Sequence, residues 1–346
     1  MNLPAKQRGV ALIIAMFIFA LVSIAAVAMA SRQTYDIRRT ENLIHYDQAF
    51  TYALGAEKYA QQAITSDTDP NLDYYGENNG DNFLTKPVAG EVEGGKIMGY
   101  IHDASARFPV NNVVDANGNR NEMYVDAFQR LVNFVTSSDD CGAQGSFNPD
   151  LGNVLLDWID KNEQTEVGGA EDGDYLKLEH WPHRAANQWM ASITELRELN
   201  NIIAEEYNCF VGDDKNLPLI NAIREPDVAI NVNTAPASVI QSIYSKIDGK
   251  ILEALTADRD TNPYRDVKSF VEKLEKELAF DDKDPDQKKQ HDDFIKQMGL
   301  WKFAVNSQYF EAKITIDVGG IGFTMTSLLK RDGKKVTTLQ RSIGTL

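Results

Sequence analysis

Cysteine and catalytic motifs are scarce in this chain of 346 residues, and their scarcity excludes several classes of protein. The two cysteines, Cys141 and Cys209, are too far apart to be the paired ligands of a zinc site. The chain contains no Gly-x-Ser-x-Gly, His-Glu-x-x-His, P-loop or dinucleotide-binding motif. His180 and His183 could form a metal-binding pair, but we interpret them as packing or surface residues. We therefore expect a protein that is not an enzyme.

Basic residues are also in deficit. The chain has 35 Lys and Arg against 51 Asp and Glu, a net charge of −16. Lys6 and Arg8 are the only charged residues among the first thirty, so nearly all of the acidic excess belongs to the remainder. An acidic surface repels phosphate groups, and nucleic acid is therefore not expected as a partner. With 43% hydrophobic residues, the chain is nevertheless apolar enough to fold around a core.

Charged residues are absent from Val10–Ala30, an apolar run that one serine interrupts. A helix of about 20 residues crosses the hydrocarbon core of a bilayer, and Lys6 and Arg8 before the run place the N-terminus in the cytoplasm. Three interpretations compete. A secretory signal peptide would be cut near Ala28-Met29-Ala30, although the run is longer than such peptides usually have. A signal anchor would stay uncut, and a short leader, residues 1–9, would be removed before the apolar run.

The helix is expected to continue far beyond the apolar run. Residues 31–64 contain no proline and one glycine, Gly55. Alanines recur at spacings of three and four, which places them on one helix face: Ala49, Ala53, Ala56, Ala60 and Ala63. A helix from Val10 to about Ser66 would be roughly 85 Å long, and its alanine face would pack on a sheet. The alternative is a membrane helix followed by a separate amphipathic helix.

The rest of the chain divides into strands, helices and strands again. Residues 67–95 are rich in Asp, Asn, Gly and Pro and predict a loop, whereas 96–103 and 108–114 predict strands. From 115 to 300 the apolar spacing is helical, and Thr234 is expected to cap a helix whose first turn contains Pro236. Alternation over residues 310–318 predicts a strand, Gly319-Gly320 a tight hairpin, and residues 321 onward and 336–343 two further strands.

The N-terminal sequence resembles the processing site of type IV pilins and type II secretion pseudopilins. In that class the leader is cut after a glycine, here Gly9, and the new first residue, here Val10, is N-methylated. Most members have glutamate at the fifth mature position, where this chain has Ile14. Its absence is typical of one minor pseudopilin family, general secretion pathway protein K. Further motifs resemble the same family: Ile101-His102-Asp103, Ala106-Arg107-Phe108, Leu156-Asp157-Trp158-Ile159-Asp160, Gly169-Ala170-Glu171-Asp172, His183-Arg184-Ala185-Ala186-Asn187 and Ile230-Asn231-Val232-Asn233-Thr234-Ala235.

The resemblance implies an α+β, type IV pilin-like fold, in which a long N-terminal helix packs on an antiparallel sheet and a large all-α domain is inserted. On this scheme residues 1–9 are the leader, 10–30 the transmembrane part of the helix, and 31–114 its remainder with the first strands. Residues 115–300 form the inserted domain, with two units that resemble sterile-alpha-motif or helix-hairpin-helix modules. Residues 301–346 are the closing strands.

The resemblance also implies a place at the tip of the type II secretion pseudopilus, which exports folded proteins across the outer membrane. The expected partners are minor pseudopilins I and J, the inner-membrane assembly platform and prepilin peptidase, with the soluble domain in the periplasm. Ile14 cannot pair with the N-terminal amine of a subunit ahead, which suits the first position. The alternatives are a minor pilin of a type IV pilus or DNA-uptake pseudopilus and, last, a membrane-anchored periplasmic hydrolase.

Acidic residues crowd a glycine-containing stretch at 157–174, and hard oxygen ligands in such a loop suit Ca²⁺. The spacing is not that of an EF-hand, and the alternative is a solvated acidic loop. The resemblance favours calcium, because the protein K family binds it. The expected ligands are Asp160, Gln164, Glu171, Asp172 and Asp174. A second acidic run, residues 281–286, is interpreted as a solvated loop.

The two cysteines can be interpreted as a pair if the soluble part is exported. Cys141 and Cys209 are then expected to form a disulfide. Closing a loop of that length would stabilise the fold by roughly 4 kcal/mol in the chain-entropy account. The alternative is two separate buried thiols.

Overall fold

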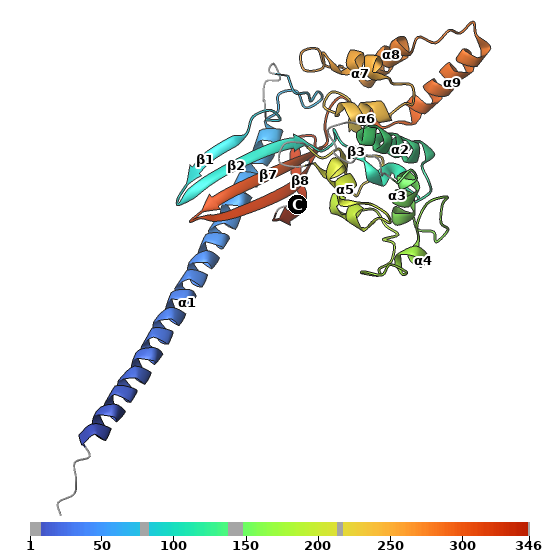
Figure 1. Ribbon diagram of the computed structural model, residues 1–346. Coiled ribbons are helices and arrows are strands. Elements are labelled where there is room, and N and C mark those ends of the chain that lie inside the picture. The colour runs from blue at the N-terminus through green and yellow to red at the C-terminus, as the bar shows by residue number, and fades with distance from the viewer. Residues whose placement is uncertain (1–7, 77–82, 138–147, 213–216, 345–346) are drawn as a thin grey trace, which may run out of the picture.

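One helix dominates the shape of the molecule. The computed structural model describes residues 8–76, 83–137, 148–212 and 217–344. Helix α1 (Arg8–Thr65) has 58 residues, and its N-terminal half projects away from everything else (Figure 1). At 1.5 Å per residue it is about 87 Å long. The prediction of one continuous helix is confirmed, because no proline interrupts the backbone hydrogen bonds of this stretch.

A five-stranded antiparallel sheet packs against the C-terminal half of α1, with strand order β1-β2-β7-β8-β9. The strands are β1 (Val88–Val92), β2 (Gly95–Asp103), β7 (Tyr309–Val318), β8 (Ile321–Asp332) and β9 (Lys335–Ile343). Ala49 and Ala53 of α1 are buried against Ile314 and Ile316 of β7. The alanine face and the inward face of β7 are therefore as the sequence predicts.

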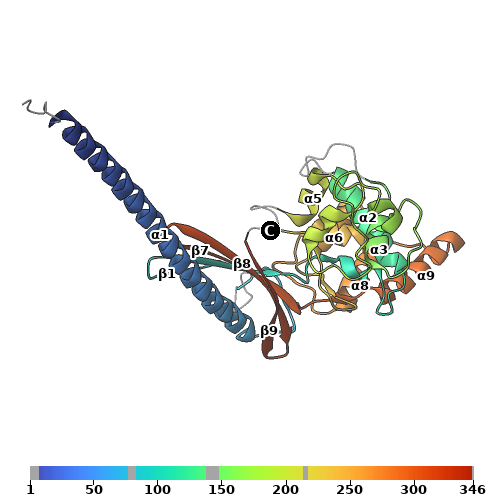
Figure 2. The same ribbon diagram turned by 90° about the horizontal axis from the view of Figure 1, so that it is seen from below.

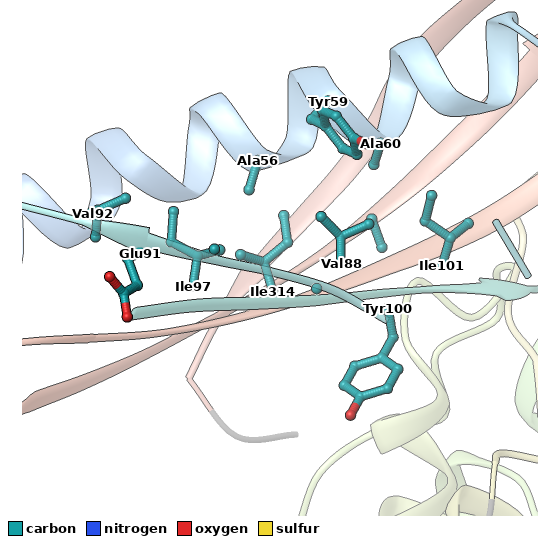
Figure 3. Close-up of a pocket in the computed structure, with 13 residues that line it drawn as sticks. Ala56, Tyr59, Ala60, Val88, Glu91, Val92, Ile97, Tyr100, Ile101 and Ile314 are labelled. Atoms are coloured by element: carbon teal, nitrogen blue, oxygen red, sulfur yellow. The ribbon is translucent and has the colours of Figure 1, made fainter. Parts of the chain in front are cut away.

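Small side chains leave a gap in this packing. Between α1 and the hairpin β1–β2 lies an apolar cavity of about 200 Å³. Figure 3 shows Ala56 and Ala60 of α1 facing Val88, Ile97 and Ile314 across it. Alanine lets the helix approach the sheet, but it does not fill the space beside the edge strand.

Two strand predictions are wrong in part. Residues 88–92 were expected in a loop and form β1, an edge strand whose first four residues are exposed and show no apolar alternation. Of the strand expected at 108–114, only β3 (Phe108–Pro109) forms, and a 3-10 helix, η1 (Val110–Val113), follows it. The side chain of Asn111 turns inward there and donates to the carbonyls of Met190 and Ile223, at 3.0 and 2.9 Å.

The hairpin between β7 and β8 requires glycine. Gly319 and Gly320 have φ values of 59° and 80°, the left-handed region that glycine enters without strain. A Cβ atom at Gly319 would also lie 2.6 Å from Nε2 of His45 on α1. The hairpin predicted at these two residues is confirmed, and it rests directly against the long helix.

The chain between β2 and β7, which pair directly in the sheet, forms a second, mostly helical body that we call the head (residues 104–308). It lies beside one end of the sheet (Figures 1 and 2). Two short parallel pairs, β3 with β4 (Ile220–Asn221) and β5 (Ile230–Asn231) with β6 (Phe303–Ala304), accompany its helices. The helices are α2 (Glu122–Ser137), α3 (Leu151–Ile159), α4 (Asp172–Tyr175), η3 (Ile193–Glu198), α5 (Ala204–Val211), α6 (Ala237–Ser242), α7 (Gly249–Thr256), α8 (Val267–Leu278) and α9 (Pro285–Leu300).

One large apolar core runs through the head and includes Phe108, Phe128, Leu155 and Phe270. The predicted α+β architecture is confirmed: a long helix lies on an antiparallel sheet, and a largely helical body is inserted into the sheet's connections.

Candidate membrane anchor, polar junction and acidic loop

The N-terminal half of α1 is apolar and uncovered. The helix is long and apolar enough to cross a membrane, and none of its most apolar 18-residue stretch is buried. Val10, Phe17 and Leu21 expose 58%, 64% and 50% of their surface. Burying one such side chain is worth about 1.5–3 kcal/mol, so water is an unfavourable surrounding for this surface. Lipid or other apolar helices would cover it.

The predicted processing junction lies at the start of α1. Gly9 and Val10 belong to its first turn, and residues 1–7 lie outside the described residues. Ile14 is one turn further on and is 53% exposed. The first acidic residue of α1 is Asp36, so this apolar segment offers no carboxylate to a neighbouring subunit. Cleavage after Gly9 and methylation of Val10 stay predictions.

A buried carboxylate ties α1 to the last two strands. Glu57 lies on the helix face that packs on the sheet, and its side chain is 1% exposed. Its oxygens accept hydrogen bonds from Arg341 at 2.7 and 2.8 Å, from Ser327 at 2.7 Å and from Thr338 at 2.8 Å. Burial alone would raise the pKa of Glu57, but these hydrogen bonds outweigh it and lower the pKa to about 2.

Buried polar groups also join the sheet to the head, and we call this cluster the polar junction (Asp73, Asp103, Asn231, Thr234, Ser307 and Arg331). Asp103, at the end of β2, is 1% exposed. It accepts hydrogen bonds from the hydroxyls of Thr234 and Ser307 and from Nδ2 of Asn231. Burial raises the pKa of Asp103, and those hydrogen bonds oppose the rise.

The predicted cap at Thr234 is wrong, and the polar junction explains why. The N-cap of α6 is Pro236, and no side chain caps the helix there. The hydroxyl of Thr234 instead donates to the buried carboxylate of Asp103, one of several hydrogen bonds that satisfy this carboxylate. A tertiary contact thus replaces the local one that the sequence suggested.

Arg331 closes the polar junction from strand β8. Its guanidinium is 4% exposed and pairs with Asp67, at 2.6 Å, and with Asp73. It also donates to the carbonyl of Ser307 at 2.7 Å. Burial raises the pKa of Asp73 to about 7, and Arg331 opposes the rise. Arg331 thus ties strand β8 to the segment after α1, through Asp67 and Asp73, and to the head, through Ser307.

A second buried pair reinforces the same joint. Arg107, just after β2, donates to both oxygens of Glu311 on β7, at 2.8 and 3.0 Å. Such bidentate pairs have a defined geometry as well as charge complementarity. Burial alone would raise the pKa of Glu311, but Arg107 beside it lowers the pKa. Sequence reasoning did not find this pair, although Arg107 belongs to one of the motifs that resemble the family.

The acidic loop brings part of the predicted calcium set together. Asp160 ends α3 and Glu171 precedes α4, and both are buried, as is Asp157, which the predicted set leaves out. Burial and, to a smaller extent, the neighbouring carboxylates raise the pKa values of Asp157 and Glu171 to about 7. Both carboxylate oxygens of Glu171 are buried without a hydrogen-bond partner. A bound cation would compensate for this buried, unpaired charge.

The other predicted ligands are placed less favourably. Asp172 accepts hydrogen bonds from Arg184 at 2.9 Å and from the backbone of Ala185 at 3.0 Å. Asp174 lies 3.7 Å from the ammonium of Lys177, and Gln164 is exposed. Within the described ranges, no group of three or more His, Cys, Asp or Glu side chains is arranged to hold a metal ion. The calcium site stays a prediction.

The disulfide also stays a prediction. Cys209 lies in α5 and is half-buried. Cys141 belongs to residues 138–147, outside the part of the chain that the structure describes.

A projecting apolar helix whose second half packs on an antiparallel sheet defines a pilin-like subunit, with the head as its unusual addition. Two family models described as type II secretion system, protein K, match residues 106–210 and 230–291. The chain belongs to this family of minor pseudopilins, and the resemblance noted from its motifs is confirmed.

Relatives in three bacteria match nearly end to end. Type II secretion system protein K of Pectobacterium carotovorum subsp. carotovorum is 28% identical, over 98% of this chain and 97% of its own length. The protein of that name in Pseudomonas aeruginosa is 29% identical, over 98% and 93%. A chain in the crystal structure of the GspK-GspI-GspJ complex from enterotoxigenic Escherichia coli has a TM-score of 0.66 and 24% identity, over 89% of this chain and 100% of that one. That likeness supports the fold.

Proposed function

We propose that this protein is the tip subunit of the type II secretion pseudopilus and that it initiates assembly with minor pseudopilins I and J. The observation that carries the proposal is Ile14 on the uncovered half of α1, where no carboxylate is available for a subunit ahead. The head supports the same position, because its bulk lies beside the C-terminal end of α1, where a further subunit would have to stack (Figure 1).

The proposed topology follows from the same helix. Val10–Ala30 spans the inner membrane, the basic leader stays in the cytoplasm, and the sheet and head lie in the periplasm. The assembly platform draws the subunit from the membrane into a growing fibre, whose extension moves folded proteins across the outer membrane. The complex named for GspK, GspI and GspJ from enterotoxigenic Escherichia coli, one chain of which has a similar fold, supports partners I and J.

The tip position predicts one copy of this protein per fibre. Full-length protein with a small epitope tag should appear as a single label at one end of sheared pseudopili in electron micrographs. Cells without the protein should form few fibres, and Ile14→Glu should reduce initiation. Labels distributed along the fibres would contradict the tip role while leaving the family assignment intact.

Prepilin peptidase is proposed to remove residues 1–9 and to methylate Val10. The intact mass should fall by those nine residues and rise by one methyl group when the peptidase is present. Gly9→Leu should block both changes. An unchanged mass, or a mature N-terminus near Ser31, would contradict this processing.

Calcium is proposed as a structural ion of the acidic loop, with Asp160 and Glu171 as the best-placed ligands and Asp157 beside them. The bound ion would neutralise repelling carboxylates and order the loop. Titration with Ca²⁺ should raise the melting temperature of the full-length protein, chelation should lower it, and Glu171→Gln should abolish the difference. No calorimetric signal in the micromolar range would contradict the site.

The Cys141–Cys209 disulfide is proposed alongside export. Peptide mapping under non-reducing conditions should recover the two cysteines in one linked fragment, and two alkylated thiols would contradict the disulfide.

We also propose that the protein acts in assembly and is not an enzyme. The rival role, a minor pilin of a type IV or DNA-uptake fibre, conflicts with the net charge of −16, which disfavours DNA.

A further inference from the structure

Trp181 is presented to the outside of the head in an unusual way. It exposes 88% of its surface, more than any other large hydrophobic side chain among the described residues. Its φ is 58°, in the left-handed region that bulky side chains rarely adopt. An aromatic side chain of this size is usually buried in a soluble domain, so its exposure needs an explanation.

The half-buried ring of His183 holds Trp181 in this conformation. Nδ1 of His183 donates to the carbonyl of Trp181 at 2.9 Å. The His183 ring packs 5.0 Å from the ring of Tyr175 and 5.8 Å from that of Trp158, measured between centroids. Tyr175 and Trp158 belong to the head core. The interpretation of His183 as a packing residue is confirmed, and its packing fixes the backbone that displays the tryptophan.

Charged side chains of both signs flank Trp181 in the sequence. Arg184, three residues after it, pairs with Asp172 at 2.9 Å and leaves 73% of its own side chain exposed. Glu179, two residues before Trp181, is exposed. Charged groups beside an exposed ring are costly to place in the hydrocarbon of a membrane, whereas a protein surface can pair with them. Tryptophan is enriched at interface hot spots, where it fills a well-packed pocket of the partner.

The side of the head on which Trp181 lies indicates which partner it would meet. Figure 1 places α4, which ends six residues before Trp181, on the side of the head toward the N-terminal end of α1, with α7, α8 and α9 on the opposite side. When α1 helices run parallel in a fibre, the side toward their N-terminal ends faces the subunits that follow.

We propose that Trp181 anchors the head to the globular domain of the next pilin-like subunit, by entering an apolar pocket there. The inference rests on the proposed function, since it assumes a fibre below the head. It assigns a contact to the head itself, separate from the packing of the apolar helices.

Copurification of the full-length protein with minor pseudopilins I and J in detergent tests the anchor. Trp181→Ala should weaken binding at least tenfold, and Trp181→Phe should restore part of it. Leu300→Ala is the matched control, because Leu300 is 63% exposed at the end of α9, on the opposite side of the head. The control should bind as the unaltered protein does, and all three variants should keep its melting temperature.

A photo-crosslinking residue at position 181 should also join I or J, whereas one at position 300 should not. Unchanged binding of Trp181→Ala, or crosslinks from position 181 to lipid alone, would overturn the anchor while leaving the proposed function standing. If the unaltered protein itself failed to bind I and J, the proposed partnership would fail, and the anchor with it.

Discussion

Glu57 illustrates how a carboxylate becomes strongly acidic inside a protein core. The side chain is almost inaccessible to water, which favours the neutral acid, yet four hydrogen bonds and the charge of Arg341 favour the anion. The partners come from β8 and β9, so the ionised carboxylate links α1 to strands that are remote in sequence. Its contribution to stability should therefore depend on pH.

The folded pKa of Glu57 is about 2, below the ordinary value of 4.5. Because the folded pKa is depressed, the stabilisation is fully present above pH 4.5 and is lost as the pH falls toward 2. Glu57→Gln should lower the free energy of unfolding at pH 7 by about 2 kcal/mol and flatten its decline in acid. Denaturant titration of the full-length protein in detergent measures both effects. Equal losses in Glu91→Gln, on the exposed edge strand, would contradict the assignment.

Arg107 and Glu311 form a buried pair in which each charge compensates the other. Arg107→Ala leaves a buried carboxylate without its cation and should destabilise the protein by about 3–5 kcal/mol. Replacing both residues, by Arg107→Met with Glu311→Leu, should cost clearly less, since no charge is then stranded. Unfolding curves of the single and double variants measure the difference. A double variant as unstable as the single one would show that the packing of the side chains, not the charge, matters at this joint.

At the scale of elements, α8 and α9 are joined through a histidine. Nε2 of His291 on α9 lies 2.8 Å from Glu275 on α8, and Nδ1 lies 2.9 Å from Asp282 in the connection between them. The ring also stacks on Phe280, with 4.9 Å between centroids. The two carboxylates raise the pKa of His291. The acidic run at 281–286 is exposed, as the sequence suggested, and it also contributes Asp282 to this contact and Asp284 as the N-cap of α9.

This contact predicts a pH-dependent hairpin. Since the folded pKa of His291 is raised, its stabilisation is present below the ordinary value of 6.5 and is lost as the pH rises through the folded pKa. Amide exchange in α8 and α9, corrected for the intrinsic rate, should be slower at pH 6 than at pH 8.5. His291→Gln should remove the difference, whereas His180→Gln should keep it. Equal protection at both pH values in the unaltered protein would contradict the contact.

Periodic elements could be predicted from the sequence, and irregular ones could not. The alanine spacing of α1 and the alternation in β7 each repeat over several turns or residue pairs, so burial of one face leaves a strong pattern. β1 leaves none, because both its faces are largely exposed. Thr234 and Asn111 carry the local signals of a cap and a strand, but buried partners far along the chain decide what they do.

The same distinction applies to the candidate sites. The membrane segment and the processing junction are contiguous in sequence, so composition and a resemblance suffice to propose them. Glu57 and the polar junction depend on residues far apart in sequence, 128 positions for Asn231 with Asp103 and 284 for Glu57 with Arg341. No pattern among neighbouring residues of the sequence predicts such pairs. A lone acidic residue on a face of small side chains was the one available signal for Glu57.

At the scale of the whole molecule, the body and the anchor are energetically separate. The sheet and the head share the buried Arg107–Glu311 pair and the hydrogen bonds of Asp103, whereas the apolar start of α1 is uncovered. Changes in that segment should therefore alter where the protein resides without unfolding it. Phe17 and Leu21, one helical turn apart and 64% and 50% exposed, are suitable positions.

Arginine at both positions, Phe17→Arg with Leu21→Arg, should oppose membrane insertion by about 2.5–3.5 kcal/mol per charge. The altered protein should leave the carbonate-resistant membrane fraction, while its body should keep the melting temperature of the unaltered protein. Tyr35→Arg is the control, because Tyr35 is 74% exposed but lies beyond the apolar run, and it should remain in the membrane. Retention of the double variant would mean that contacts outside Val10–Ala30 hold the protein there, and a lowered melting temperature would mean that the anchor supports the fold.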